Sequence, residues 1–245
     1  MFCLQLPRRR PWEIAGLTLA LLVLAACRTA APPSVPERAE VHPGINDEFL
    51  APDLNVALWT ERFEREGREI YDQRHRIVEA ADVRPGMWVA DVGAGTGLFT
   101  LLFAERVGPT GRVYAVDIAP EFLAHIEQRA RAAGWRQVRT VLGGERSAKL
   151  PPRALDRVFL CDTYHHFEYP RAMLASLHRA LKPGGELVLV DFRRVPGESS
   201  EWVLNHVRAG EEVFTAEIEA AGFQKIARAD FLRENYLVRF RKVGR

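Results

Sequence analysis

Hydrophobic residues follow two different spacings along this chain, and the spacing changes near residue 85. Before this point, four large apolar residues recur at intervals of four or seven positions: Trp59, Phe63, Ile70 and Ile77. Such intervals place side chains on one face of a helix. We therefore predict helices between residues 55 and 81, with Gly67 dividing the segment into two.

Beyond residue 85, short apolar strands alternate with amphipathic helices. The predicted strands have the sequences MWVADV, RVYAVDI, QVRTVLG, ALDRVFLCD and GELVLVDF. The predicted helices between them include LFTLLFAERV, PEFLAHIEQRARAAG and AMLASLHRALKPGG, the last closed by Pro-Gly-Gly. Strands that alternate with helices form a parallel sheet covered on both faces.

The last part of the chain predicts one more helix, EEVFTAEIEAAG, and two further strands, FQKIARA and ENYLVRFRK. Two neighbouring strands at the end of a chain close a sheet as an antiparallel hairpin. The expected fold class is therefore α/β. It consists of a seven-stranded, mostly parallel sheet with helices on both faces, an antiparallel C-terminal hairpin and N-terminal helices.

The beginning of the chain has the pattern of an export signal. Three arginines at positions 8–10 precede an apolar stretch, residues 14–26, which is too short to span a bilayer as a helix. The stretch ends in Leu24-Ala25-Ala26-Cys27. This ending resembles the lipobox of bacterial lipoproteins, in which cleavage precedes the cysteine and the cysteine thiol carries a lipid. A short membrane anchor and an incorrectly assigned start codon are the alternatives.

These patterns divide the chain into four parts. We expect a signal peptide at residues 1–26, a Pro- and Ala-rich tether at 27–45, N-terminal helices at 46–84 and the main domain at 85–245. The protein would then reside in the bacterial cell envelope, facing the periplasm, and would contact the membrane only through a lipid on Cys27. With a later start codon it would be cytoplasmic.

The charge balance excludes a strongly charged partner. The chain has 34 basic and 32 acidic residues, a net charge of +2, and removal of residues 1–26 would leave 31 of each. We therefore expect no binding to nucleic acid. After cleavage, with Cys27 carrying lipid, Cys161 would be the remaining free cysteine, so no intrachain disulfide is expected.

A glycine-rich turn follows the first strand of the predicted sheet. Gly93, Gly95 and Gly97 alternate with other residues, and such glycines let a ligand approach backbone N–H groups at the start of a helix. The dinucleotide pattern G-x-G-x-x-G would require glycine at position 98, which is Leu98. Asp91 places a negative charge beside the turn, where an ammonium or sulfonium group is attracted and a pyrophosphate is repelled.

A second carboxylate, Asp117, ends the next strand, twenty residues after Gly97. At such a position a carboxylate accepts hydrogen bonds from both hydroxyls of a ribose. An adenosine with a cationic tail describes S-adenosylmethionine, which we predict as the cofactor.

With these motifs the sequence resembles the class I S-adenosylmethionine-dependent methyltransferases. The resemblance covers roughly residues 45–245, and its most specific motifs are Asp91-Val92-Gly93-Ala94-Gly95-Thr96-Gly97, Val116-Asp117-Ile118 and Leu181-Lys182-Pro183-Gly184-Gly185. It implies a Rossmann-like fold and a helical lid formed by residues 46–84.

The resemblance also implies roles for individual residues. The three glycines would line the methionine part of the cofactor, Asp117 would hold the ribose, and Ile118 would pack on the adenine. Glu145 is the nearest match to the family's acidic or amide side chain for the adenine amino group. The expected cofactor-binding residues are therefore Asp91, Gly93, Gly95, Gly97, Asp117, Ile118 and Glu145.

The segment after the fourth strand is the candidate acceptor wall, because ligands bind at the carboxyl ends of parallel strands. It reads Cys161-Asp162-Thr163-Tyr164-His165-His166-Phe167. A histidine here can remove a proton from an acceptor hydroxyl or amine, with Asp162 holding the correct tautomer. His206, after the fifth strand, could reach the same crevice. The candidate catalytic residues are Asp162, Tyr164, His165 and His206.

Several alternatives remain open. One histidine of the pair, more so His166, could instead be a structural cap of the next helix, and proximity alone could accelerate methyl transfer. We assign no metal ligands, because Asp162 and the histidines would need a second and third ligand that the sequence does not identify.

The main function expected is methyl transfer to an unidentified, small-molecule acceptor. The alternatives are a non-catalytic envelope sensor of an adenosyl ligand and an NAD-binding oxidoreductase. The acceptor's identity and the oligomeric state are not determined.

Overall fold

The computed structural model describes residues 1–2 and 41–244. Most of the predicted signal peptide, most of the tether and the predicted lipid site at Cys27 lie outside the described residues, so these assignments stay predictions. Within the part of the chain that is described, no helix combines the length and apolar character needed to cross a membrane.

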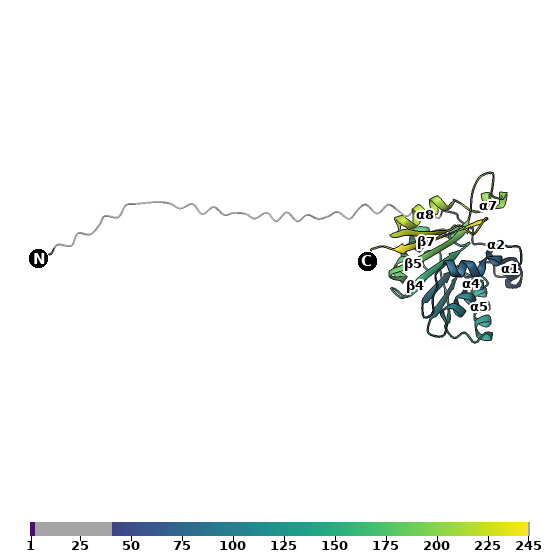
Figure 1. Cartoon of the computed structure of the whole chain (residues 1–245), viewed down its shortest axis with the longest axis horizontal. Helices are drawn as coiled ribbons and strands as arrows, with labels where there is room; N and C mark the ends of the chain where they lie inside the picture. Colours follow the sequence, from purple (N-terminus) through teal and green to yellow (C-terminus); the bar gives the residue numbers. More distant parts are fainter. Residues whose placement is uncertain (3–40, 245) are drawn as a thin grey trace. The chain divides into compact units, whose positions relative to one another are not determined.

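Residues 41–244 contain a seven-stranded sheet with the strand order β3-β2-β1-β4-β5-β7-β6 (Figure 1). The strands are β1 Trp88–Val92, β2 Arg112–Asp117, β3 Val138–Leu142, β4 Leu155–Cys161, β5 Leu181–Phe192, β6 Phe223–Ala229 and β7 Asn235–Lys242. Neighbouring strands are parallel from β3 to β5, whereas β7 runs antiparallel to both β5 and β6. The expected fold class is confirmed, including the C-terminal hairpin.

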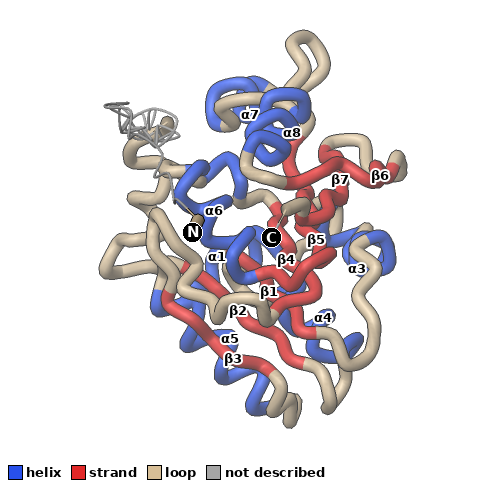
Figure 2. The backbone as a smooth tube through the Cα atoms, turned by 90° about the vertical axis from the view of Figure 1, so that its left-hand side faces the viewer, coloured by secondary structure: helices blue, strands red, loops and turns tan. Residues whose placement is uncertain are grey.

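Helices occupy the connections from β1 to β2, from β2 to β3, from β4 to β5 and from β5 to β6, and Figure 2 shows α3 and α4 on one side of the sheet and α6 on the other. The helices are α1 Val56–Phe63, α2 Glu69–Asp72, α3 Arg74–Ala80, α4 Leu98–Val107, α5 Pro120–Ala132, α6 Pro170–Ala180, α7 Glu201–His206 and α8 Glu211–Ala220, with a 3₁₀ turn, η1, at Tyr164–His166. The connection from β3 to β4, residues 143–154, contains no helix.

Successive side chains of the central strands point to opposite faces, and both faces are buried. In β4, Val158 and Leu160 join the cluster that includes α6 and α8, whereas Phe159 between them joins the cluster that includes α3 and α4. All three side chains have an exposed fraction of 0%. This explains why the strands read as continuous apolar runs rather than as alternating patterns.

Two helix boundaries differ from the prediction. Three helices rather than two precede the sheet, since the chain bends at Gly67 and again between α2 and α3. The helix before the fifth strand ends at Ala180, and the Lys-Pro-Gly-Gly segment already belongs to β5, where Leu181 pairs with Leu155. Pro183 disfavours helical conformation at Lys182, and the pairing of Leu181 with Leu155 ends the helix one residue earlier still.

The described end of the expected tether packs against the main domain. The backbone N–H of Val41 donates to the carbonyl of Glu168 at 2.9 Å, and the buried Asn46 side chain donates to Glu168 and to the carbonyl of His166. Residues 41–46 therefore lie beside the segment that follows β4.

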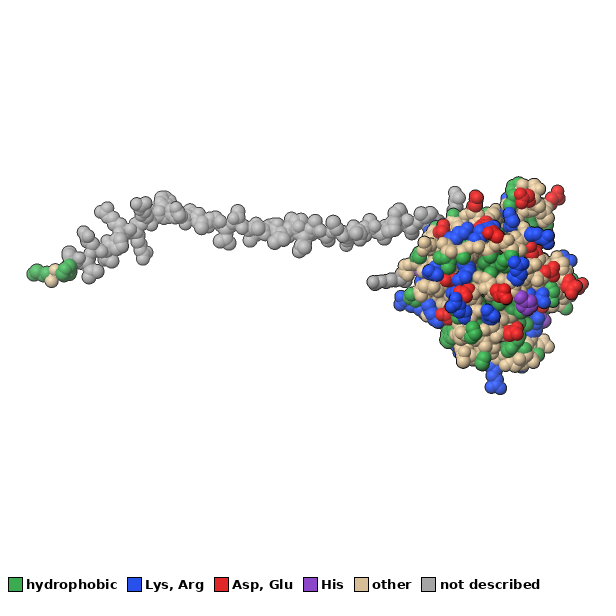
Figure 3. All heavy atoms as spheres, viewed as in Figure 1, with side chains coloured by type: hydrophobic (Ala, Val, Ile, Leu, Met, Phe, Trp, Pro, Cys, Tyr) green, Lys and Arg blue, Asp and Glu red, His purple; other side chains and the backbone are tan. Residues whose placement is uncertain are grey.

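Basic and acidic side chains are interspersed over the face shown in Figure 3, in line with the balanced charge.

Gly97 allows α4 and α5 to approach each other. It precedes α4 with a φ of +88°, and a Cβ atom placed on it would lie 2.7 Å from Cγ1 of Ile126 on α5. No side chain fits this distance without movement of the core.

We expect Gly97→Ala to lower the free energy of unfolding by about 2 to 4 kcal/mol, since it adds overpacking to the cost of a positive φ. The matched control is Gly134→Ala, because Gly134 has a φ of +73° but a Cβ atom placed on it would have no neighbouring atom within 4 Å. The control should lose about 1 kcal/mol. Urea denaturation of both variants measures the difference, and equal losses would contradict the steric argument.

Candidate active site

A cavity of about 700 Å³ opens at the carboxyl ends of β1, β2 and β4, between the sheet and α1. Its walls include the glycine-rich turn and Asp117 on one side, and Asp162, His165, His166 and His206 on the other. In an open parallel sheet this edge lies at the point where the strand order reverses, here between β1 and β4. A volume of this size accommodates a ligand of cofactor size.

The glycine-rich turn is attached to the end of β2 through Asp117. Oδ2 of Asp117 accepts from the backbone N–H of Gly95 at 2.8 Å, and Oδ1 accepts from that of Ala119 at 2.9 Å. Burial raises the pKa of Asp117, and these two hydrogen bonds oppose the rise. Because each carboxylate oxygen has two lone pairs, Asp117 keeps acceptor capacity for a ligand in the cavity.

Asp91 is a second buried carboxylate in the same cavity. Its side chain is 3% exposed, and Oδ2 accepts a hydrogen bond from the hydroxyl of Thr100 at 2.6 Å. Burial raises the pKa of Asp91 to about 7; the charge of Asp117 adds to this rise, and the bond from Thr100 opposes it. The ionised form of Asp91 is therefore unfavourable in the free protein, and a bound cation would stabilise it.

An aromatic row from the N-terminal segment covers the turn. The rings of Phe49 and Trp59 lie 4.8 Å apart, and those of Trp59 and Phe63 lie 5.0 Å apart. Phe63 approaches Gly95 so closely that a Cβ atom there would lie 3.4 Å from the ring. Next to Phe63, Glu64 accepts from the hydroxyl of Thr96 at 2.7 Å and from Arg129 on α5 at 2.6 Å. The lid expected from the sequence thus lies over the turn.

The two residues expected beside the adenine also border the cavity. Ile118 follows directly after Asp117, and Glu145 lies in the turn after β3, next to Gly143 and Gly144. Glu145 is exposed, so it stands at the mouth of the cavity. Their contacts with a cofactor stay predictions.

Asp162 does not partner a histidine, and this expectation is wrong. Its Oδ2 accepts from Arg68 at 2.6 Å, and its Oδ1 accepts from Nδ2 of Asn235 at 2.7 Å. Arg68 also donates to the carbonyl of Phe63 at the end of α1. Burial raises the pKa of Asp162 to about 6, while the positive charge of Arg68 opposes the rise. Asp162 therefore fastens the lid to the sheet.

The carboxylate that holds His165 is instead Asp191, near the end of β5. Nδ1 of His165 lies 2.7 Å from Oδ1 of Asp191, and the two side chains are 1% and 0% exposed. A carboxylate in this position accepts the Nδ1 proton and leaves the lone pair on Nε2. The signal for Asp191 was present in the strand GELVLVDF, whose last residue but one is acidic and lies at the edge where the other site residues lie.

Tyr164 points away from the cavity, so its predicted catalytic role is wrong. The side chain is 0% exposed, and its hydroxyl donates to Glu217 on α8 at 2.8 Å. Glu217 is also bound by Arg208 at 2.6 Å. Burial, together with Glu217, raises the pKa of Tyr164 above its ordinary value. Tyr164 belongs to the packing between the 3₁₀ turn and α8.

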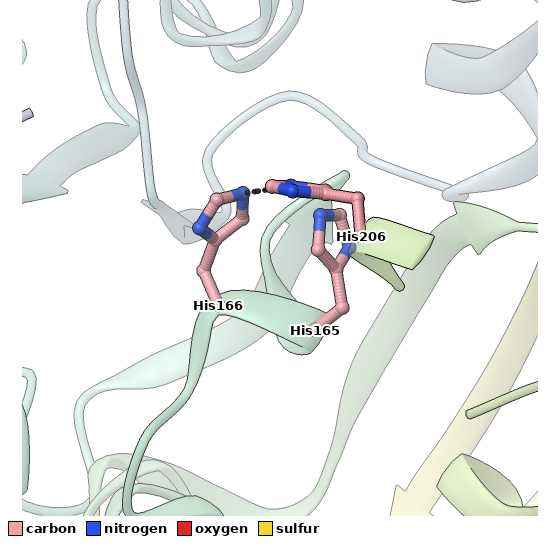
Figure 4. A group of neighbouring side chains, drawn as sticks. All are labelled: His165, His166 and His206. Atoms are coloured by element: carbon pink, nitrogen blue, oxygen red, sulfur yellow. Dashed lines mark hydrogen bonds between the residues drawn. The ribbon is translucent and has the colours of Figure 1, made fainter. Parts of the chain in front are cut away.

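His165, His166 and His206 form one group, which we call the histidine cluster (Figure 4). His165 and His166 come from the 3₁₀ turn after β4, and His206 comes from the end of α7. Nε2 of His166 lies 3.4 Å from Nε2 of His206. The ring of His206 also stacks on Trp202, with centroids 4.5 Å apart. The cluster borders the cavity, although a catalytic role for its members stays a prediction.

The surroundings of His166 and His206 favour neutral rings. Burial, with smaller contributions from neighbouring histidines, lowers the pKa of His166 to about 2 and that of His206 to about 4. His166 is not a helix cap as the alternative proposed, because Nδ1 of its ring has no hydrogen-bond partner among the described residues and α6 begins after Tyr169 without a side-chain cap.

The chain is similar to known methyltransferase domains. Residues 89–185 match the family model described as "Methyltransferase domain". A ubiquinone/menaquinone biosynthesis C-methyltransferase of Bordetella parapertussis is 36% identical over 126 residues, which is 49% of this chain and 48% of that protein. A protein-L-isoaspartate O-methyltransferase of Ignicoccus hospitalis is 38% identical over 114 residues, 46% of this chain and 51% of that protein. The chain thus spans about half the length of these curated relatives.

Among solved structures, an S-adenosylmethionine-dependent methyltransferase from Aquifex aeolicus superimposes with a TM-score of 0.69 at 23% identity. The superposition covers 77% of this chain and 99% of the other. It shows that the two proteins share a fold.

The residues of the cavity fit S-adenosylmethionine, the cofactor expected from the sequence. Two buried carboxylates, Asp91 and Asp117, face a space large enough for a ligand of this size, and burial raises the pKa of both because it disfavours their charged forms. A ligand with an ammonium and a sulfonium group supplies positive charge, and its ribose hydroxyls can donate to Asp117.

We expect the affinity for S-adenosylmethionine to rise with pH between pH 6 and 7.5, by about tenfold, because binding favours the ionised form of Asp91 and releases its proton. Affinity rises with pH because the pKa of Asp91 is about 7 in the free protein and a bound cation lowers it. Isothermal titration calorimetry across this range measures both the affinity and the proton release.

The control for this prediction is Asp91→Asn, which keeps the shape of the side chain but has no charge to titrate. The variant should bind more weakly at pH 7.5, and its affinity should vary little with pH. An unchanged slope in the variant would show that the proton comes from another group, such as Asp117.

Proposed function

We propose that this protein, whose residues 89–185 match the family model described as "Methyltransferase domain", uses S-adenosylmethionine to methylate a small aromatic acceptor that carries a hydroxyl group. S-adenosylmethionine supplies a methyl group that its sulfonium already activates. The acceptor class and the transfer itself are the proposed part, because the chain covers only half of its curated relatives.

One observation carries the proposal: the predicted cofactor residues and the histidine cluster border the same cavity. The turn at Gly95 and the carboxylate of Asp117 form one wall, and the histidines form another. A methyl donor and an acceptor have to occupy one enclosed space for transfer to proceed, since most of the acceleration comes from holding them close together and in line.

The lining of the cavity favours an aromatic acceptor. Phe49, Trp59 and Phe192 contribute ring surfaces near the histidines, and the ring of Phe49 lies 5.5 Å from that of His166. Trp202, 55% exposed, borders the mouth of the same cavity. Flat aromatic walls stack on flat ligands. Curated relatives described as methyltransferases of ubiquinone and menaquinone biosynthesis support a quinol-like acceptor.

The histidine cluster is the place where the acceptor loses its proton. Of the three rings, His165 is the proposed base, because the lowered pKa values of His166 and His206 make these two rings weak proton acceptors. Asp191 acts as a positioning residue, since its bond to Nδ1 orients the His165 ring. The lid residues Phe63 and Glu64 close the cavity over the turn and exclude water.

The proposal is tested by offering the full-length protein methyl-labelled S-adenosylmethionine with a hydroquinone or with the corresponding oxidised quinone. We expect label in the hydroquinone alone, because only the reduced ring has a hydroxyl group to deprotonate. Label in neither compound, or equal label in both, would contradict the proposed acceptor class.

A matched variant connects this reaction to the cofactor residues. Asp117→Ala should weaken binding of S-adenosylmethionine by about 2 to 3 kcal/mol, the value of charge-assisted hydrogen bonds, while NAD should bind to neither protein. Unchanged affinity in the variant would remove Asp117 from the ribose site, and binding of NAD to the wild type would favour the oxidoreductase alternative.

We further propose that the protein is attached to the cell envelope by a lipid on Cys27. The support is the basic start, the short apolar stretch and the Leu24-Ala25-Ala26-Cys27 ending. Cells grown with labelled palmitate should incorporate label into the wild-type protein but not into the Cys27→Ala variant. Incorporation into both proteins would place the lipid elsewhere, and incorporation into neither would support a cytoplasmic protein with a later start.

A further inference from the structure

We infer that His165, His166 and His206 bind a divalent transition-metal ion such as Zn²⁺ at the wall of the cavity. The first observation is convergence: one ring nitrogen from each histidine lies within 4.8 Å of the other two. Figure 4 shows the three rings meeting although His206 comes from a helix forty positions further along the chain. Imidazole nitrogen is a preferred ligand of Zn²⁺, Co²⁺ and Ni²⁺.

The second observation is the distance between two of the nitrogens. Nε2 of His166 and Nε2 of His206 are 3.4 Å apart. Two nitrogens bound to one tetrahedral metal ion at about 2.1 Å each lie about 3.4 Å from one another. All three ligand atoms lie within 4.8 Å of one another, so rotations of the side chains can bring the third nitrogen to the same distance.

The third observation is that hydrogen bonding explains the cluster poorly. A nitrogen pair at 3.4 Å forms at best a weak hydrogen bond, and only when the two rings take opposite tautomers. The contact between the two Nε2 atoms is therefore weak as it stands, and a metal ion between them would use the lone pairs of both.

The fourth observation is the outer support of His165. Asp191, 0% exposed, lies 2.7 Å from Nδ1 of His165 and so leaves Nε2 as the ligand atom. A carboxylate bound to the far nitrogen of a histidine is the usual outer partner of a metal ligand, because it fixes the ring and makes its free nitrogen more basic. Such a carboxylate is not required by a histidine that only packs.

Three protein ligands leave one position of a tetrahedral ion open, as in catalytic rather than structural zinc sites. Because the cluster borders the cavity, the open position faces the space where the acceptor is placed. An acceptor hydroxyl bound there becomes more acidic and releases its proton to water, and in this metal-bound form the ion replaces His165 as the group that promotes deprotonation. This role of the open position rests on the proposed function, whereas binding of the ion does not.

The test is titration of the full-length protein, first freed of metal by a chelator, with Co²⁺ followed by Zn²⁺. We expect one equivalent of Co²⁺ with an absorption spectrum of nitrogen coordination, which Zn²⁺ displaces. His206→Gln should lower the affinity at least tenfold, and Asp191→Asn should lower it about 10- to 100-fold. Affinity that is the same in wild type and both variants, or no saturable binding at micromolar concentrations, would overturn the site.

Two controls separate this result from unfolding and from the proposed function. His75→Gln changes an exposed histidine on α3, outside the cluster, and should bind Co²⁺ as the wild type does. Binding of S-adenosylmethionine to each variant reports whether the domain remains folded. A hydroquinone should alter the Co²⁺ spectrum of the wild type; an unaltered spectrum would overturn the role of the open position, and metal binding without any methyl transfer would overturn the proposed function alone.

Discussion

The parallel pairing of β1 with β4 is the constraint on which the site depends. Their register places Val92 beside Leu160, so the two following turns leave the sheet at the same edge. The turns are in such close contact that a Cβ atom on Gly93 would lie 2.3 Å from the side chain of Thr163. The absence of a side chain at Gly93 therefore lets the glycine-rich turn and the histidine turn share one cavity, rather than form two separate walls.

Carboxylates at this edge serve two different purposes. Asp91 and Asp117 are buried in the cavity without an ion-pair partner in the part of the chain that the structure describes, which disfavours their charged forms in the free protein and favours a cationic ligand. Asp162 and Glu64 instead form ion pairs with Arg68 and Arg129 and thereby fasten the N-terminal helices to the sheet. The same residue type thus contributes either to ligand binding or to the position of the lid, depending on whether an arginine reaches it.

The elements and the cofactor side of the site could be predicted because they depend on local sequence. A strand, a glycine turn and a helix follow one another directly, and the next strand, β2, ends in the acidic residue Asp117. The antiparallel hairpin was likewise visible as two adjacent strands. The helix boundary at Ala180 was missed because it depends on the pairing of Leu181 with Leu155 across the sheet.

The sequence by itself determined the α/β fold, the glycine-rich turn and the two carboxylates beside it, since hydrophobic spacing and residue types within a short segment decide these features. Only the tertiary structure decided which carboxylate forms a hydrogen bond with which histidine. Asp191 lies twenty-six positions from His165, and His206 lies forty positions from His166. The direction of a side chain such as Tyr164 also depends on the helix that packs against it. Contacts between distant segments arise from how helices pack on the sheet, and spacing along the chain does not encode them.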